Sequence, residues 1–108
     1  MPRRDADLLV EDMLAAIRKI EQYTDGMEEW QFLEDAKTID AVVRNLEIVG
    51  EAARRLPEDF VARFSDVPWH QMAGLRNRIV HDYFGLDLEL IWQILRFDLP
   101  QLRTRLEG

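Results

Sequence analysis

The sequence has 108 residues, of which 47% are hydrophobic and 32% are charged, a composition ordinary for one soluble globular domain with a modest core. It has no cysteine, which excludes disulfides and thiolate metal sites, and no apolar run near the length of a membrane span. The net charge of −7 opposes tight, sequence-independent binding to nucleic acid, so any such role needs a local basic site.

The first predicted helix runs from Asp5 to Tyr23. Before it, the amino terminus lacks the apolar core of a signal peptide, so we expect a cytoplasmic protein without a membrane partner. Thr24-Asp25-Gly26 ends the helix, with Gly26 as a left-handed cap, and residues 28–35 predict a second, short helix. The first helix is indicated by an apolar stripe at three- and four-residue spacing: Leu9, Met13, Ala16, Ile17, Ile20 and Tyr23.

The second long helix ends before Pro57, and residues 57–64 predict another short one. Gly50 and Ala53 lie on the apolar side of the long helix, where small residues allow another helix to approach closely. The stripe that indicates this helix is Ile39, Val42, Val43, Leu46, Val49, Gly50 and Ala53.

Two further helices complete the prediction. Residues 66–68 (Asp-Val-Pro) predict a helix start, and the spacing of Trp69, Met72, Leu75, Ile79 and Tyr83 carries that helix to Gly85.

Asp87 is the predicted cap of the last helix, within which Pro100 predicts a kink or break. Its stripe is Leu88, Ile91, Trp92, Leu95, Leu99, Leu102 and Leu106. No segment alternates with a two-residue period, so the predicted fold class is all-α, a bundle of four main helices plus a short one.

The stretch RNRIVHDY, residues 76–83, concentrates polar side chains in two predicted helical turns. His81 is able to exchange protons near neutral pH, and Arg76 offers a planar cation suited to phosphate. Together they are capable of cleaving RNA without a metal, with His81 moving a proton and Arg76 stabilising charge on the phosphorus-centred transition state. The alternative is structural: a histidine near a helix end often caps or packs, and Tyr83 often anchors the edge of a core.

Helix geometry complicates the catalytic interpretation, because Arg76 and His81 lie about 140° apart on an ideal helix. Either the helix loosens near Gly85, or a second copy completes the site across a dimer axis. No metal site is expected, since His70 and His81 lie roughly 16 Å apart along the predicted helix and cannot share an ion within one chain.

The sequence resembles the HepT-like (DUF86) proteins of the HEPN superfamily. The resemblance covers almost the whole chain, and it implies that residues 1–108 form one HepT-like domain. It includes DMLAAIRKIEQYT at 12–24, TIDAVVRNLEIVGEAARRLP at 38–57, VPWHQMAGLRNRIVHDYFGLDLELIW at 67–92 and DLPQL at 98–102. The family motif Arg-x4-His-x-Tyr is met by Arg76, His81 and Tyr83.

The resemblance implies a HEPN-like helical bundle that forms a homodimer in which two motifs meet in a cleft. It implies a metal-independent ribonuclease, without cofactor, that acts on RNA as the toxin of a type VII toxin–antitoxin system. Arg76 and His81 would be catalytic, with Asn77 as an assisting polar residue. The implied partner is an MntA-like nucleotidyltransferase antitoxin that inactivates the toxin by attaching AMP to Tyr83; whether the dimers assemble further with it is left open.

Two competing functions stay open at this point. One is a non-catalytic helical binding module that complexes the nucleotidyltransferase, which suits the acidic net charge. The other is a purely structural helical dimer, which does not explain the density of polar residues at 76–83.

Overall fold

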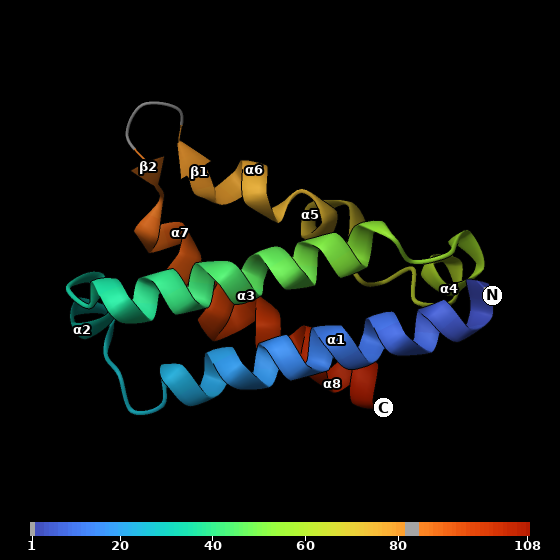
Figure 1. Ribbon diagram of the computed structural model, residues 1–108, viewed down its shortest axis with the longest axis horizontal. Helices are drawn as coiled ribbons and strands as arrows, with labels where there is room; N and C mark the ends of the chain where they lie inside the picture. Colours follow the sequence, from blue (N-terminus) through green and yellow to red (C-terminus); the bar gives the residue numbers. More distant parts are fainter. Residues whose placement is uncertain (1, 82–84) are drawn as a thin grey trace.

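Two long antiparallel helices form the centre of the protein, whose computed structural model describes residues 2–81 and 85–108 and, for residues 2–5 and 81, only the backbone. Helix α1 (Pro2–Tyr23) and helix α3 (Ala36–Arg54) lie side by side over most of their length (Figure 1). The whole measures 42 × 31 × 23 Å. No helix in the described ranges is both long and apolar enough to cross a membrane.

The core lies where the predicted stripes of α1 and α3 meet. Met13, Ile17 and Ile20 of α1 and Val42, Leu46 and Val49 of α3 are completely buried, as the spacing of the apolar residues predicted. Tyr23 is the exception, since 43% of its surface is exposed at the end of α1. Helix α1 ends where Thr24-Asp25-Gly26 was predicted to end it, with Gly26 at φ +76° in the left-handed region.

Short helices cover the two ends of this pair. Helix α2 (Glu29–Leu33) precedes α3, and α4 (Glu58–Arg63) follows it. Asp35 caps α3, because its carboxylate accepts hydrogen bonds from the Thr38 amide at 3.0 Å and from the Thr38 hydroxyl at 2.8 Å. These bonds lower the pKa of Asp35, since they favour its charged form. Helices α2 and α4 confirm the short helices predicted at 28–35 and 57–64, with shorter bounds.

The helix predicted from residues 66–68 to Gly85 is wrong in its extent. In place of one helix to Gly85, the structure has α5 (Trp69–Ala73), α6 (Leu75–Ile79) and a two-stranded hairpin of β1 (Val80–His81) and β2 (Gly85–Leu86). Val80 pairs with Leu86 and His81 with Gly85 in antiparallel register, a pairing so short that the fold class remains all-α, as predicted.

The hairpin has a local cause at each end. Gly85 adopts φ +80°, a conformation that glycine enters without strain, and residues 82–84 lie outside the described part. The Asp87 amide donates to the Ile79 carbonyl at 2.7 Å, a bond that closes the hairpin at the end of α6. The carboxylate of Asp87 then accepts from the Leu90 amide at 3.1 Å and caps α7, as predicted.

The last helical stretch is continuous, from α7 (Leu88–Gln93) through a π-helical turn, η1 (Ile94–Asp98), into α8 (Leu99–Glu107). No break occurs at Pro100, which lies in the first turn of α8; the irregularity precedes it, as this π turn, in which the Leu99 amide donates to the carbonyl of Ile94, five residues earlier. A π turn accommodates a proline that has no amide hydrogen to give to the preceding turn. The protein is thus mainly helical, as predicted, with α3 between α1 and α5–α6 (Figure 1).

Candidate active site

The arginine of the predicted motif, Arg76, borders an open groove between α3 and the α5–α6 segment. The groove has a volume of about 310 Å³ and is lined by Glu47, Gly50, Glu51, Arg54, Ala73 and Arg76; we call it the Arg76 groove. Four of the six residues come from one face of α3, because their spacing of three, four and seven residues returns to the same side of a helix. The groove thus joins the motif to a helix more than twenty residues earlier in the chain.

Gly50 determines how closely the motif segment approaches α3. A Cβ atom at this position would lie 3.1 Å from the Met72 carbonyl oxygen and 3.5 Å from the Leu75 Cβ. The first distance is tighter than ordinary van der Waals contact, so a larger residue would push α5 away from α3. The prediction that Gly50 allows another helix to approach is confirmed, and the approaching segment is the one that carries the motif.

The Arg76 side chain is available to an anion. It is 77% exposed, and its Nε atom lies 3.9 Å from Oε2 of Glu47, a carboxylate that is itself 49% exposed. An ion pair this long and this exposed contributes little free energy, because water screens both charges. A phosphate that met the guanidinium in a bidentate manner would compete effectively with Glu47.

A second arginine occupies the same groove. Nη2 of Arg54 donates to Oε1 of Glu51 at 2.8 Å, and these side chains are 65% and 56% exposed. Glu47, Glu51 and Arg54 were not predicted as site residues, because nothing in the sequence indicates which face of α3 the motif approaches. The available signal was Gly50, whose small size marked the place of a close contact.

The structure describes the other predicted site residues less completely. Asn77 is exposed on α6, and its side chain has no hydrogen-bond partner within residues 2–81 and 85–108. His81 lies in β1, so the helical angle of about 140° between Arg76 and His81 does not apply; its side chain is not described. Tyr83 lies outside the described residues.

Arg78 lies within the stretch 76–83 but at none of the three defining positions of the motif. It is about 200° from Arg76 on an ideal helix, so the two arginines flank the buried face of Leu75 and Ile79 on opposite sides. Its Nη1 atom is buried and has no hydrogen-bond partner among the residues that the structure describes. Only the Arg76 side of α6 therefore faces the groove.

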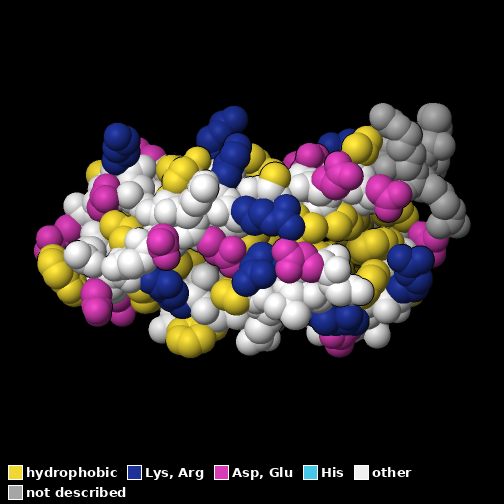
Figure 2. Space-filling view, turned by 90° about the horizontal axis from the view of Figure 1, so that it is seen from below, with side chains coloured by type: hydrophobic (Ala, Val, Ile, Leu, Met, Phe, Trp, Pro, Cys, Tyr) yellow, Lys and Arg dark blue, Asp and Glu magenta, His cyan; other side chains and the backbone are white. Residues whose placement is uncertain are grey.

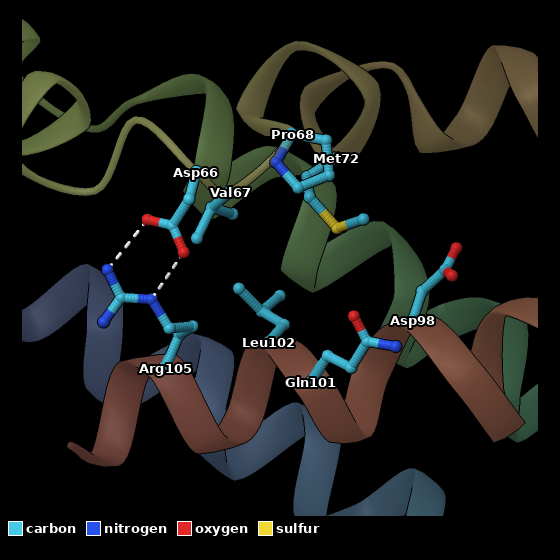
Figure 3. Close-up of a pocket in the computed structure, with 8 residues that line it drawn as sticks. All are labelled: Asp66, Val67, Pro68, Met72, Asp98, Gln101, Leu102 and Arg105. Carbon is cyan, nitrogen blue, oxygen red and sulfur yellow. Dashed lines mark hydrogen bonds and ion pairs between the residues drawn. The ribbon is translucent and has the colours of Figure 1, made fainter.

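A second cavity, of about 120 Å³, lies between α8 and the start of α5 (Figure 3). Val67, Met72 and Leu102 give it an apolar lining. Arg105 extends from α8 and donates to both carboxylate oxygens of Asp66, at 2.7 and 2.8 Å. This bidentate bond lowers the pKa of Asp66, because it favours the charged carboxylate. Arg105 and Asp66 are thus paired with each other at this cavity, which fits a packing seam better than a reaction site.

Charged side chains of both signs share one face of the protein. The face drawn in Figure 2 carries lysine and arginine side chains beside aspartate and glutamate side chains, without a continuous area of one sign. Arg18, Arg54, Arg103 and Arg105 each form an ion pair at 3.3 Å or less. In the part of the chain that the structure describes, no three histidine, aspartate or glutamate side chains are grouped for a metal ion.

Comparison with known proteins gives a consistent result. A "Putative RNase MJ0127" from Methanocaldococcus jannaschii is 42% identical over 100 residues, which cover 93% of this chain and 83% of the relative. A "Probable ribonuclease HepT" from Thermococcus cleftensis is 40% identical over 107 residues, covering 99% and 96%. No solved structure gives a significant match. The family profile described as ribonuclease HepT-like matches residues 13–107, a range that includes the Arg76 groove and the whole motif, and the chain therefore belongs to the ribonuclease HepT-like family.

Proposed function

We propose that this protein is a metal-independent endoribonuclease and the toxin of a type VII toxin–antitoxin pair. The observation that carries the proposal is the Arg76 side chain, 77% exposed beside an open groove, within a chain that belongs to the ribonuclease HepT-like family. The names of the two relatives, which refer to RNase activity, agree with it. A guanidinium that is exposed and only weakly paired is suited to a phosphodiester.

The proposed reaction is a transfer within the RNA strand. His81 removes the proton from a 2′-hydroxyl, and the 2′-oxygen then attacks the adjacent phosphorus. The bond from phosphorus to the 5′-oxygen breaks, and that oxygen takes up a proton. The products are a 2′,3′-cyclic phosphate and a 5′-hydroxyl end. Arg76 stabilises the negative charge that accumulates on the phosphoryl oxygens in the transition state, and Asn77, next to it, assists by hydrogen bonding.

We propose a homodimer for this reaction. Arg76 lies at the Arg76 groove, while His81 lies beyond the end of α6, in the hairpin. A two-fold axis close to α6 would bring the motif of a second chain to the first, since such an interface presents the same surface from both subunits. One histidine would then accept the proton of the 2′-hydroxyl and the other would supply the proton to the leaving oxygen.

The proposed partner is an MntA-like nucleotidyltransferase that modifies Tyr83. The phenolic oxygen of Tyr83 attacks the α-phosphorus of ATP, diphosphate leaves, and the phenolic proton passes to solvent. The product carries an AMP group with a negative phosphate in the same motif as Arg76. Such a group would occupy the arginine and repel RNA, so modification silences the enzyme.

The competing function is a binding module that complexes the nucleotidyltransferase without cleaving RNA. Its support is electrostatic: the net charge is −7, and the face in Figure 2 has no continuous basic area. The two functions differ in one measurement. Purified protein should cleave RNA in the presence of EDTA and leave 2′,3′-cyclic phosphate or 3′-phosphate ends. If chelation stops cleavage, the metal-free scheme is wrong; if no RNA is cut under any condition, the binding module is correct.

The role of Tyr83 requires a separate experiment. Tyr83→Phe keeps the ring but removes the oxygen that would accept AMP, so the variant should still cleave RNA when expressed alone. Co-expression with the nucleotidyltransferase should fail to neutralise it, whereas the wild type should gain the mass of one or more AMP groups and lose activity. A Phe variant that is silenced without a mass change would show inhibition by complex formation, contrary to the modification scheme.

A further inference from the structure

The Arg76 groove holds two arginines, and only one of them belongs to the motif. Arg76 comes from α6, whereas Arg54 comes from the last turn of α3. Each has a glutamate of α3 beside it: Glu47 lies 3.9 Å from Arg76, and Glu51 lies 2.8 Å from Arg54. The groove therefore presents two exposed arginine–glutamate pairs in a row.

The two pairs occupy different places along α3. Glu47 and Glu51, the carboxylates beside the two arginines, are four residues apart, which corresponds to about 6 Å along the helix axis. Each guanidinium has its own place along the helix and offers a separate planar fork that matches one phosphate. Two neighbouring phosphates of one nucleic-acid strand could occupy the two forks.

A phosphate binds these arginines only by displacing the glutamates beside them. All four side chains are at least 49% exposed, and exposed ion pairs contribute little free energy, so each glutamate is displaced readily by a better anion. Phosphate is such an anion, because its oxygens match the planar fork of a guanidinium. The groove without ligand has two positive and two negative side chains, which agrees with a protein whose net charge is −7.

We infer that Arg54 binds a second RNA phosphate while Arg76 binds the scissile one, and that Glu47 and Glu51 hold the two arginines until RNA displaces them. The inference rests on the proposed ribonuclease function and adds a binding residue outside the motif. Arg54 is thus a residue for binding and positioning the strand, and it touches no reacting atom.

Equilibrium binding tests the inference without depending on cleavage. The probe is an eight-nucleotide oligomer with 2′-deoxyribose throughout, which lacks the attacking hydroxyl. Arg54→Gln should bind it about three- to tenfold more weakly than the wild type, and the slope of log affinity against log salt should fall by about 0.7, as for the loss of one phosphate contact on a single strand. Glu47→Gln should bind it about two- to fivefold more tightly, because it removes the carboxylate that competes for Arg76.

Arg18→Gln is the matched control. Arg18 also forms an exposed pair, with Glu107 at 2.9 Å, but it lies on α1, away from the groove. This variant loses the same charge and should bind the oligomer like the wild type. In cleavage assays on an eight-nucleotide RNA, Arg54→Gln should raise KM and change kcat little. On a dinucleotide that has a single phosphate, the same variant should lose less cleavage efficiency relative to the wild type.

The outcomes separate this inference from the proposed function. If the wild type cleaves RNA and Arg54→Gln matches Arg18→Gln in affinity and salt slope, the second phosphate site is wrong and the ribonuclease function stands. If Arg54→Gln lowers kcat with KM unchanged, Arg54 acts in the reaction and the assignment as a binding residue is overturned. A wild type that cleaves no RNA overturns the ribonuclease function, whatever the oligomer binding shows.

Discussion

The α1–α3 pair and the segment from α5 to β2 are built in different ways. The pair consists of two long helices whose apolar stripes face each other and whose central residues are fully buried. The segment consists of short elements, and its residues alternate between buried anchors, such as Leu75 and Ile79, and exposed polar groups, such as Arg76 and Asn77. The pair thus supplies stability, and the segment presents side chains to solvent while Gly50 holds it against α3.

The largest expected effect is a loss of RNA cleavage, caused by a change in the exposed part of the segment from α5 to β2. Stability should stay unchanged. Arg76→Ala removes a 77% exposed side chain whose only close partner in the described ranges is Glu47 at 3.9 Å, so the free energy of unfolding should change by less than about 0.5 kcal/mol. RNA cleavage should fall by about 10²- to 10³-fold, because the fixed cation that stabilises the transition state is gone.

His81→Ala should reduce cleavage by about 10²- to 10⁴-fold through loss of the proton carrier. Chemical denaturation and cleavage assays on both variants, with Arg18→Ala as the control, test the division between the two regions. Full activity in either motif variant would remove that residue from the reaction. A variant that has lost its helical signal would instead make the segment part of the stable core.

The next effect belongs to the α1–α3 pair and concerns stability alone. Leu46 is completely buried in α3, so Leu46→Ala should lower the free energy of unfolding by about 2–5 kcal/mol, from lost burial and the cavity that remains. Val80→Ala truncates a residue of the hairpin that is 41% exposed, and it should cost less than about 1 kcal/mol. Urea unfolding of both variants measures the difference, and equal costs would contradict the contrast between the regions.

The sequence predicted these two regions with different success, for a physical reason. Buried stripes recur at helical spacing, so α1 and α3 could be located from their own residues, and Asp87 and Gly26 could be assigned as cap and stop. Trp69, Met72, Leu75 and Ile79 also have helical spacing, which does not reveal that the helix is interrupted at Gly74 and ends at Ile79.

That ending depends on contacts outside the local pattern. The Asp87 amide bonds to the Ile79 carbonyl, and Gly85 allows the backbone to enter β2 at φ +80°. Of the site, Arg76 could be proposed from the motif, and the role of Asn77, which is exposed on α6, stays a prediction. Glu47 and Arg54 could not be proposed, because their position at the motif follows from how α5 and α6 pack on α3.

A smaller effect should reveal the coupling between the two regions. Gly50→Val places a branched side chain where even a Cβ would lie 3.1 Å from the Met72 carbonyl, so it should lower the free energy of unfolding by about 1–3 kcal/mol. Gly50→Ala should cost less, because alanine adds one carbon and improves helix propensity. Cleavage should decrease in the same order, since displacement of α5 from α3 widens the Arg76 groove. Unchanged activity in a destabilised Val variant would show that the groove does not need this close contact.

The smallest expected effect is on stability, and it belongs to the seam that holds α8 to the start of α5. The Arg105 guanidinium lowers the pKa of the Asp66 carboxyl below its ordinary value of 3.8. A depressed pKa in the folded state means that the ion pair stabilises the fold at a pH above about 3.8, and that this contribution is lost as the pH falls through the lower, folded-state pKa. Asp66→Asn should therefore be slightly less stable than the wild type at pH 6, and the difference should shrink below pH 3.8.

Urea unfolding of the two proteins from pH 6 to pH 3 measures this convergence. Both partners are exposed at the mouth of the cavity in Figure 3, so water screens the pair and the difference should stay below that of either Gly50 variant. A difference that stays constant down to pH 3 would mean that Asp66 acts through its shape and neutral hydrogen bonds. RNA cleavage by Asp66→Asn should equal that of the wild type, because no residue that lines the cavity in Figure 3 also lines the Arg76 groove.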